Sequence, residues 1–516
     1  MSLALLTPLR LEARAARAGA SRATVIRTGM GPRRSARAAS SAMEACADAT
    51  AVAVLGVGGA LVGDLQPGEV VVADRLVGPD RSVAVPGAAL IAAELRREGV
   101  RARVGPIACS DHVVTGPERD DMAAAGAVAV DMESIWLSPV ADGRPFAVVR
   151  AVVDTPVHEP RSPATVRHVA RAYRALQQCV PALERWAAAA IPRRVVLPSP
   201  RSVCAGVVRA IDIVERALDR YGTPIHVRRQ IVHNTHVVEE LEAKGAVFVR
   251  EVDEVPVGGR VVLAAHGVHP EVRADAEARD LRVIDATCPL VAKVHAEARR
   301  FAARGDSILL IGHGDHEEVE GTVGEAPEAI SVVGSLGEAD DVTVADPTSV
   351  AFLTQTTLAV DAVDEIVERL RQRFPLIEGP RADDICYATQ NRQDAVRAIS
   401  DDCDVLLVVG SGNSSNSRRL TEVAERAGCA AHLVDGPDDI CLAWLAGAHA
   451  VGVTAGASAP EAWVQAVVGA LGHLGPVTVD ERSVVAEDVS FPLPAELRDL
   501  PPAPDSASAA STLEVT

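Results

Sequence analysis

Three stretches that each open with a cysteine decide the fold of the larger part of this 516-residue chain: CAGVVRAI at 204–211, CPLVAKVH at 288–295 and CYATQNRQ at 386–393. After each cysteine the sequence runs through a helical stretch, then a strand-like apolar run, then a polar tip. The separations are 29 positions from Cys204 to His233, 28 from Cys288 to His316 and 28 from Cys386 to Ser414. Open α/β sheets bind ligands at the carboxyl ends of their strands, where these tips fall. The repeat therefore predicts three α/β lobes about a pseudo-threefold axis, with one thiol from each lobe at the centre.

Hydrophobic periodicity places the elements of these units and predicts a βα alternation from residue 195 to about residue 475. The expected helices are Gly206–Tyr221, Leu290–Arg304 and Asn391–Asp401, and the expected strands are Pro224–Val227, Ser307–Ile311 and Val405–Val409. We therefore predict one α/β domain over residues 195–480. The tail at 499–516 is rich in Pro, Ala and Ser, which is typical of disorder.

Residues 1–191 are predicted to form a separate α/β domain, joined to the next by a linker at 192–194 within a proline-rich stretch. Its expected strands include Ala51–Val57, Glu69–Ala73, Ala127–Val130 and Phe146–Val153. A helix is expected over Pro163–Ala190, with Ser162 as its N-cap. Pro181 should kink or split this helix, because proline lacks the N–H that the helix interior needs.

Composition limits the classes of protein that fit. The net charge of −19 disfavours nonspecific nucleic-acid binding, and no run of 18 apolar residues predicts a membrane span. The first 40 residues are rich in Arg with Glu12 as their one acid, as in a transit peptide, but a strand-like Ala23–Ile26 before a glycine turn favours folded structure. Nine widely spaced cysteines favour a reducing compartment. Arg supplies 49 of the 51 cations, which indicates a GC-rich bacterial genome, so we expect a cytoplasmic bacterial protein.

Three converging thiolates indicate a particular kind of metal site. They can hold a [4Fe–4S] cube by three irons and leave the fourth iron open to a substrate. A structural zinc site is disfavoured, because no fourth cysteine or histidine has a common zinc spacing. Any one of these cysteines alone would be interpreted as core filler; the matched repeat reverses that interpretation. The other six share no motif and are interpreted as structural: Cys46, Cys109, Cys179, Cys403, Cys429 and Cys441.

The motifs around the repeat resemble, in family order, those of the 4-hydroxy-3-methylbut-2-enyl diphosphate reductases of the non-mevalonate isoprenoid pathway. They are Cys204-Ala-Gly-Val-Val-Arg, Val232-His-Asn, Ala265-His-Gly, Asp285-Ala-Thr-Cys-Pro, Gly312-His-Gly-Asp-His-Glu-Glu-Val-Glu-Gly, Thr354-Gln-Thr-Thr, Asp384-Ile-Cys-Tyr-Ala-Thr-Gln, Ser414-Ser-Asn-Ser and Thr454-Ala-Gly-Ala-Ser. The resemblance implies reductive dehydroxylation of the allylic diphosphate to isopentenyl and dimethylallyl diphosphates. It also implies one [4Fe–4S] cluster per chain and an external ferredoxin or flavodoxin as electron donor, with no nucleic-acid or membrane partner.

Residue roles follow from the same resemblance. The cluster ligands would be Cys204, Cys288 and Cys386. The diphosphate would be held by His233, His266, Ser414, Ser415, Asn416 and Ser458. His316, Glu318 and Thr356 would lie beside the substrate hydroxyl, with Glu318 as the proton donor. A buried carboxyl in an anionic pocket has a raised pKa, so it can be protonated near neutral pH. The alternative is an iron–sulfur redox sensor, which would not need Glu318 or the anion anchors.

Residues 1–191 resemble the nucleoside phosphorylases and nucleosidases. The motifs are Thr28-Gly-Met-Gly-Pro, Gly56-Val-Gly-Gly-Ala-Leu, Gly63-Asp-Leu-Gln-Pro-Gly-Glu, Asp131-Met-Glu-Ser and Val149-Arg-Ala-Val-Val-Asp-Thr. The resemblance implies that Glu133 binds ribose hydroxyls, that Asp154 protonates the base and that Glu12 matches an N-terminal acid. Two interpretations stay open: a domain that cleaves a nucleoside or adenosyl conjugate, or one that only binds a ligand or mediates assembly.

Overall fold

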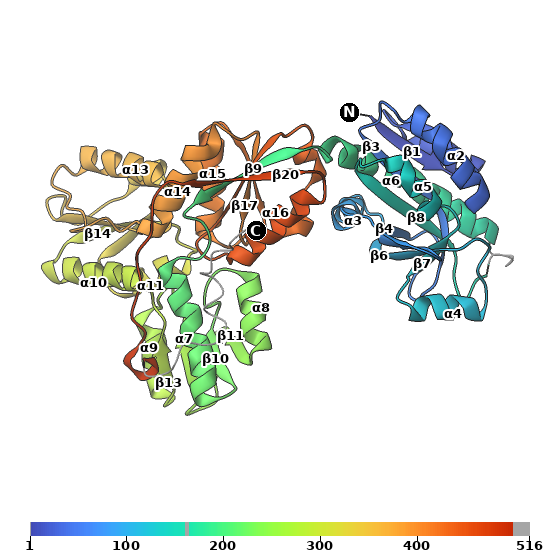
Figure 1. The fold of residues 1–516 in the computed structure, drawn as a ribbon. Coiled ribbons are helices and arrows are strands. Elements are labelled where there is room, and N and C mark those ends of the chain that lie inside the picture. Colours follow the sequence, from blue (N-terminus) through green and yellow to red (C-terminus); the bar gives the residue numbers. More distant parts are fainter. Residues whose placement is uncertain (1, 160–164, 499–516) are drawn as a thin grey trace. The chain divides into compact units, whose positions relative to one another are not determined.

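The structure, a computed structural model, describes residues 2–159 and 165–498 (Figure 1). The chain divides into two compact units. The first comprises residues 1–195 together with 436–451 and 466–479, and the second comprises residues 196–435, 452–465 and 480–516. The segment 436–451 belongs with the first unit because the short helix η4 (Leu442–Leu445) packs on α6 (Thr165–Ala189) and the Leu442 N–H donates to Glu94 of α3 (Ala88–Arg97). It lies inside the range 195–480 that the sequence predicts as one domain.

The first unit is built on one eight-stranded sheet with the order β2-β1-β3-β7-β6-β4-β5, in which β8 pairs with both β3 and β4. Its strands are β1 (Leu3–Thr7), β2 (Thr24–Arg27), β3 (Ala51–Ala60), β4 (Val70–Val77), β5 (Ser82–Ala84), β6 (Ala102–Cys109), β7 (Ala129–Asp131) and β8 (Phe146–Asp154). The other helices are α1 (Arg10–Gly19), α2 (Pro32–Ala45), α4 (Pro117–Ala124), α5 (Ser134–Leu137) and the 3-10 helix η1 (Ser138–Ala141). The Arg-rich start of the chain is thus folded structure.

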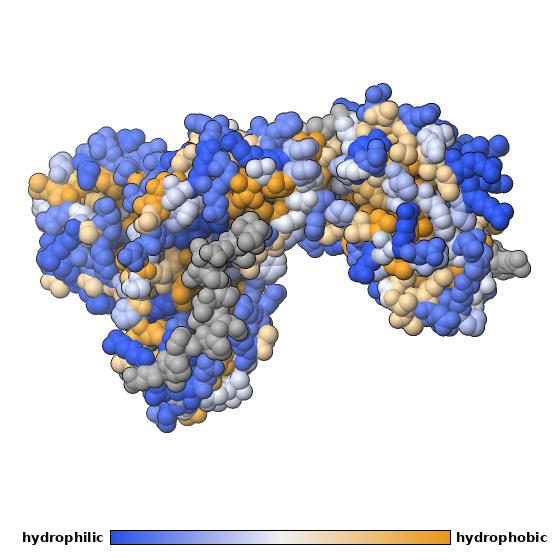
Figure 2. All heavy atoms as spheres, in the orientation of Figure 1, coloured by the Kyte–Doolittle hydropathy of each residue, from blue (hydrophilic) through white to orange (hydrophobic). Residues whose placement is uncertain are grey.

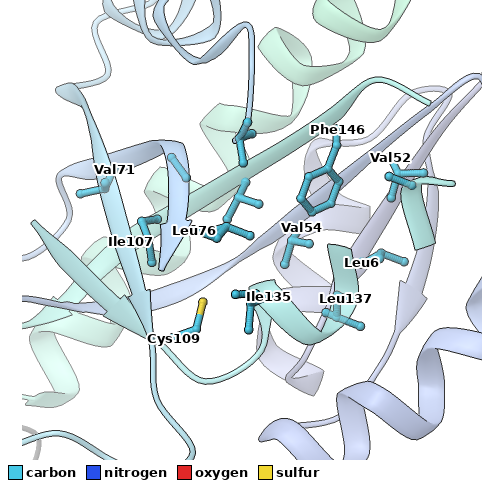
Figure 3. Packing of buried hydrophobic residues seen from close by; sticks show 14 of the residues in the cluster. Leu6, Val52, Val54, Val71, Leu76, Ile107, Cys109, Ile135, Leu137 and Phe146 are labelled. Atoms are coloured by element: carbon cyan, nitrogen blue, oxygen red, sulfur yellow. The ribbon is translucent and has the colours of Figure 1, made fainter. Parts of the chain in front are cut away.

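Aliphatic side chains fill the core of this unit in the near absence of aromatic residues. Leu6 and Val54 of neighbouring strands pack with Leu137 of α5 and with Phe146, one of only six phenylalanines in the chain (Figure 3). Branched side chains suit strands that are buried on both faces. This core holds the strand ends that carry the polar motifs of the first unit.

Of the two predicted effects of Pro181, a split of the helix is wrong, because α6 is one helix that contains this proline. Proline leaves the carbonyl four residues earlier, that of Gln177, without its helical partner. A Cβ on Gly19 of α1 would lie 2.5 Å from that oxygen. The absence of a side chain at Gly19 thus lets α1 pack closely where α6 has lost a hydrogen bond. The expected cap Ser162 and Pro163 lie outside the described residues.

The second unit contains three sheets arranged as three lobes (Figure 1). Their strand orders are β11-β10-β12-β13, β15-β14-β16 and β18-β17-β19-β9-β20. The strands are β9 (Arg193–Ser199), β10 (Ile225–Arg228), β11 (Ala246–Val249), β12 (Arg260–Leu263), β13 (Arg282–Asp285), β14 (Ser307–Ile311), β15 (Ile330–Val333), β16 (Val350–Thr354), β17 (Val405–Val409), β18 (Ala430–Val434), β19 (Ala450–Ala455) and β20 (Val477–Ser483). The three-lobed α/β fold is as predicted. Arg193 and Arg194, expected in a linker, are the first residues of β9.

The helices of this unit follow the predicted repeat closely. They are α7 (Ala205–Tyr221), α8 (Thr235–Ala243), α9 (Pro270–Ala278), α10 (Pro289–Arg304), α11 (Glu317–Gly324), α12 (Leu336–Asp341), α13 (Val360–Arg373), α14 (Tyr387–Ser400), α15 (Ser415–Arg426) and α16 (Glu461–Gly472). Cys204, Cys288 and Cys386 are the N-cap residues of α7, α10 and α14. The polar tips are also helix starts: Asn234, His316 and Ser414 cap α8, α11 and α15. Each lobe therefore points two helix N-termini, which favour negative charge, at the centre. Within the described residues, no helix is long and apolar enough to cross a membrane.

Candidate active site

The three repeat cysteines line one cavity at the centre of the second unit. Gly206, the second residue of α7, marks how closely two of the thiols approach. A Cβ at this position would lie 2.8 Å from the Cys288 Sγ and 3.8 Å from the Cys204 Sγ. The Cys386 Sγ accepts a hydrogen bond from the Thr389 N–H at 3.3 Å and lies 3.0 Å from the Thr389 hydroxyl. The other six cysteines do not line this cavity.

The chemistry of the thiols fits a cationic cluster. Burial raises the pKa of Cys288 to about 11 and that of Cys386 to about 12, and in both cases the neighbouring thiols raise it further. Three thiolates without a counter-charge are therefore unfavourable here. Backbone N–H groups at the helix starts act in the opposite direction. An iron cluster would supply the missing positive charge, and thiolates are its usual ligands.

Three histidines, of which His316 is buried and His233 and His266 are partly buried, form a compact group on the wall of this cavity. The His233 and His266 rings stack with centroids 3.9 Å apart, and His316 meets the His233 ring edge-on at 5.4 Å. Burial lowers the pKa of His233 and of His316 to about 4, and that of His266 well below its usual value. One nitrogen on each ring is buried without a hydrogen-bond partner in the described chain. The group thus offers neutral rings with unused hydrogen-bonding capacity to a polar ligand.

Glu318, the second residue of α11, is held by Thr356. The Thr356 N–H donates to the Glu318 Oε1 at 2.7 Å, and the Thr356 hydroxyl lies 3.0 Å from Oε2. The carboxyl is 2% exposed. Burial raises its pKa to about 7, although both hydrogen bonds act to lower it and the charge of Asp384 adds to the rise. Near neutral pH this group can both hold and release a proton.

Hydroxyl and amide groups at the start of α15 complete the cavity wall. The Ser458 hydroxyl donates to the His233 carbonyl at 3.0 Å and lies 3.4 Å from the Ser414 hydroxyl. Asn416 accepts from the Ala457 N–H at 2.9 Å, and its amide donates to the Thr389 hydroxyl at 3.2 Å. Asn416 is therefore linked through Thr389 to the Cys386 thiol.

A second cavity, in the first unit, brings together Glu12, Glu133 and Asp154. Glu12 accepts from the Leu9 and Val57 N–H groups at 2.7 Å each, and Glu133 accepts from the Gly31 N–H at 3.0 Å. Burial raises the pKa of both glutamates. We call this space the carboxylate cavity.

Two buried arginines neutralise part of the carboxylate cavity. Arg150 is fully buried and pairs with Asp131 at 2.6 Å and with Glu133 at 3.4 Å. Burial lowers the pKa of Arg150, but the carboxylates of Asp131, Glu133 and Glu12 raise it by more. Arg119 pairs with Asp154, and it also donates to the Ala60 and Val114 carbonyls. Asp154 is thereby held in an ion pair with Arg119.

Comparison with known proteins bears on both units. The sequence model of the LytB protein family matches residues 195–472, which is more than half of the chain. The chain belongs to the LytB protein family. Residues 10–185 match the model of the phosphorylase superfamily, so the first unit is phosphorylase-like.

Two relatives and one solved structure illustrate the similarity. Proteins from Mycolicibacterium paratuberculosis and Acidothermus cellulolyticus, both named 4-hydroxy-3-methylbut-2-enyl diphosphate reductase, are 57% and 58% identical to it over 307 residues. These matches cover 59% of this chain and 92% and 90% of the relatives. The solved structure of the E-1-hydroxy-2-methyl-but-2-enyl-4-diphosphate reductase from Plasmodium falciparum matches with a TM-score of 0.57 and 35% identity, over 60% of this chain and 97% of that one.

All twelve residues that the sequence assigned to the LytB site line its cavity, and the three assigned to the first unit line the carboxylate cavity. The structure adds Thr389, Thr357 and Phe491 to the LytB cavity. Thr389 could have been identified from the sequence, since it stands three residues after an N-cap cysteine, where a helix N–H faces the cap. Phe491 could not, because it lies outside every motif. Arg119 was also missed, since nothing local links it to Asp154.

Proposed function

We propose that the LytB unit reduces 4-hydroxy-3-methylbut-2-enyl diphosphate to isopentenyl and dimethylallyl diphosphates. The reaction consumes two electrons and two protons, breaks the carbon–oxygen bond of the allylic hydroxyl and releases water. One observation carries the proposal. Three thiols, a protonatable carboxyl and a set of neutral hydrogen-bonding groups converge on one cavity of a LytB-family oxidoreductase.

The cofactor we propose is one [4Fe–4S] cluster held by Cys204, Cys288 and Cys386. When bound, such a cluster supplies electrons and an iron site that is open to a substrate oxygen. A cluster with three irons on cysteines and the fourth iron open is supported by the available ligands, since no fourth cysteine lines the cavity in the described chain. Electrons would come from a ferredoxin or flavodoxin.

The diphosphate would be bound by the histidine group together with Ser414, Ser415, Asn416 and Ser458. Neither lysine nor arginine lines this cavity among the described residues, so binding would depend on neutral donors. A diphosphate accepts many hydrogen bonds, and the unused ring nitrogens of His233 and His266 are suited to it. A bound anion would also raise the depressed pKa of these histidines, which strengthens the interaction.

Glu318 would deliver a proton to the leaving hydroxyl. Its carboxyl is kept protonatable near neutral pH by burial, and Thr356 fixes its orientation through two hydrogen bonds. A redox sensor would have no use for such an acid. The buried carboxyl and the anion-binding wall therefore favour the enzyme over the sensor.

The test is an anaerobic purification followed by iron and sulfide quantitation and a reduced-viologen assay on the hydroxylated allylic diphosphate. We expect about four irons per chain and dye oxidation that depends on the substrate. A chain that carries zinc or no metal, and remains inactive after cluster reconstitution, would exclude the reductase assignment.

For the first unit we propose a binding site for a nucleoside or adenosyl conjugate in the carboxylate cavity, with Glu133 on the ribose hydroxyls. Cleavage would require Glu12 and Asp154, which the cavity brings together. The ion pair with Arg119 bears on this second step, because the group that would protonate the base is in contact with a guanidinium. Incubation of the full chain with adenosine should show binding that Glu133→Gln weakens. Release of adenine, lost in Asp154→Asn, would favour cleavage, and binding without release would favour a binding domain.

A further inference from the structure

Glu317 lies beside the histidine group of the LytB cavity but is not among the residues that line it. It is the first residue of α11 and precedes the acid Glu318. Its carboxylate lies 3.7 Å from the His266 Nδ1. One oxygen of this carboxylate and one ring nitrogen each of His266 and His233 lie within 4.8 Å of one another. The carboxylate therefore faces both rings of the stacked pair.

Glu317 is a partly buried acid, whereas charged side chains normally lie at the surface. The outer face of the same lobe follows that rule and is hydrophilic over α10 (Figure 2). The Glu317 side chain is only 22% exposed, and burial raises its pKa. The Arg229 guanidinium, 3.7 Å away, lowers this pKa and favours the ionised form. Because Arg229 also pairs with Glu251 and Glu320, it neutralises Glu317 only in part.

Ring nitrogens of both histidines are unpaired on their buried side. The Nδ1 atoms of His233 and His266 are buried and have no hydrogen-bond partner in the part of the chain that the structure describes. An imidazolium carries an N–H on both nitrogens, and a buried N–H without an acceptor is unfavourable. When the Nε2–H of a cationic ring binds a phosphoryl oxygen in the cavity, the Nδ1–H therefore needs an acceptor on the other side. Glu317 is placed to be that acceptor.

A metal ion shared by these three residues is disfavoured by the geometry of the rings. The two ring planes are 16° from parallel, and their centroids are 3.9 Å apart. The lone pair of an imidazole nitrogen lies in the ring plane, so two nearly parallel rings cannot both direct one at a single ion. Hydrogen bonds from the two rings to a carboxylate do not have to meet at one point, because it has two oxygens and several lone pairs.

We propose that Glu317 is a positioning residue of the LytB site, whose carboxylate is the counter-charge that lets His266 and His233 bind a diphosphate as imidazolium cations. This role rests on the proposed function, since the diphosphate supplies the anion on the opposite side of the pair. Each ring that becomes cationic takes its proton from the solvent. Anions on two sides of a partly buried imidazole favour its charged form, and removal of one of them lowers its pKa again. Besides Arg229, Glu251 and Glu320, the charged or titratable groups around the pair are His316, Glu318, Arg228 and Arg418.

The test measures the affinity of the holoenzyme for isopentenyl diphosphate and the protons taken up on binding, by anaerobic titration calorimetry in buffers of different ionisation enthalpy. At about pH 8 this ester is fully ionised, so the protons go to the protein. The variant is Glu317→Gln, which keeps the shape and removes the charge. The matched control is Glu320→Gln, which removes a charge from the same helix and the same Arg229. Glu318 is present in both, so its own protonation cancels in the difference. Unchanged iron content and thermal unfolding show that both variants fold.

We expect Glu317→Gln to bind the diphosphate roughly tenfold more weakly than the control and to take up about one proton fewer per ligand. Glu317→Asp, which retains the charge, should recover the proton uptake. Proton uptake that is equal in the two Gln variants would overturn the role of Glu317, whatever their affinities. A Glu317→Asp variant that loses as much uptake as Glu317→Gln would do the same, since shape rather than charge would then explain the loss. A wild-type chain that binds no isopentenyl diphosphate would instead overturn the diphosphate site itself, and the role of Glu317 with it.

Discussion

The two cavities differ in whether cationic side chains lie beside their ionisable groups. The LytB cavity gathers three thiols, three histidines and one carboxyl, and no lysine or arginine lines it among the described residues. The carboxylate cavity pairs its acids internally, with Arg150 on Asp131 and Glu133 and with Arg119 on Asp154. The first arrangement would receive its charge from the metal cluster and the anion that we propose to bind there. In the second, Asp131, Glu133 and Asp154 already contact a cation, which suits a ligand that brings hydroxyl groups rather than charge.

The largest expected effect is the loss of the cluster. Cys288→Ser should abolish turnover and remove most of the bound iron, because two thiolates cannot retain a cluster that three hold. Iron quantitation and dye-coupled turnover measure both properties. Cys441→Ser is the matched control, since Cys441 lies outside the LytB cavity. If both variants kept their iron, the thiol centre would not be the metal site, and the contrast between the cavities would fail.

The second prediction tests Glu318, the carboxylic acid that lines the LytB cavity among the described residues. Glu318→Gln keeps the shape and hydrogen-bonding capacity at Thr356 but removes the proton donor. Turnover should fall by about 10²- to 10⁴-fold, the usual contribution of general acid catalysis. Iron content and the visible spectrum should stay unchanged.

The matched control is Glu320→Gln, two residues along the same helix, where the carboxylate pairs with Arg229 near the surface. This variant should keep nearly full turnover. Equal activity in the two variants would remove Glu318 from the proposed role.

The third prediction addresses the carboxylate cavity. Arg150→Met leaves Asp131 and Glu133 buried without their cation. Breaking a buried pair in this way typically costs about 3–5 kcal/mol of unfolding free energy. The unfolding transition of the first unit in urea, followed by circular dichroism, measures the loss.

Arg96→Met is the corresponding control, because Arg96 pairs with Asp438 at 3.9 Å where both side chains are exposed. Exposed pairs of this kind contribute about 0–1 kcal/mol. Similar stabilities for the two variants would mean that Arg150 is not essential to the charge balance of the cavity.

The same contrast explains how much the sequence could reveal. The LytB lobes were predictable because the signals of each repeat lie close together in the sequence. A cysteine begins a helix, a strand follows, and a polar cap begins the next helix. Each step depends on nearest neighbours in the chain, so α10 and β14 were placed to within one residue. The roles of the site residues came from the resemblance of the motifs, and these motifs lie at the ends of strands and the starts of helices.

The first unit was less predictable because its site depends on distant pairings. Arg119 meets Asp154 across 35 residues and Arg150 meets Asp131 across 19, and neither pairing leaves a local pattern. The predicted split at Pro181 also failed, since the helix continues through this proline. Gly19, 162 positions away in the chain, packs closely against the carbonyl that the proline leaves without a helical partner.

The smallest expected effect is a shift in pH dependence, and it tests whether burial sets the chemistry of Glu318. The pKa of this group is raised to about 7, so turnover that needs the protonated form should be full well below pH 7 and fall about tenfold per pH unit well above it. Because the folded pKa lies above the ordinary value of 4.5, the stability that Glu318 contributes is likewise present below pH 4.5 and lost as the pH rises through 7.

The hydrogen bond from the Thr356 hydroxyl favours the ionised form of Glu318 and lowers its pKa. Thr356→Val should therefore move the falling limb of the pH–rate profile to higher pH, whatever it does to the maximal rate. Thr322→Val is the control, since the Thr322 hydroxyl donates to the backbone carbonyl of Glu318 and not to its carboxyl. A limb that moved to lower pH in Thr356→Val would show that Thr356 stabilises the protonated acid instead.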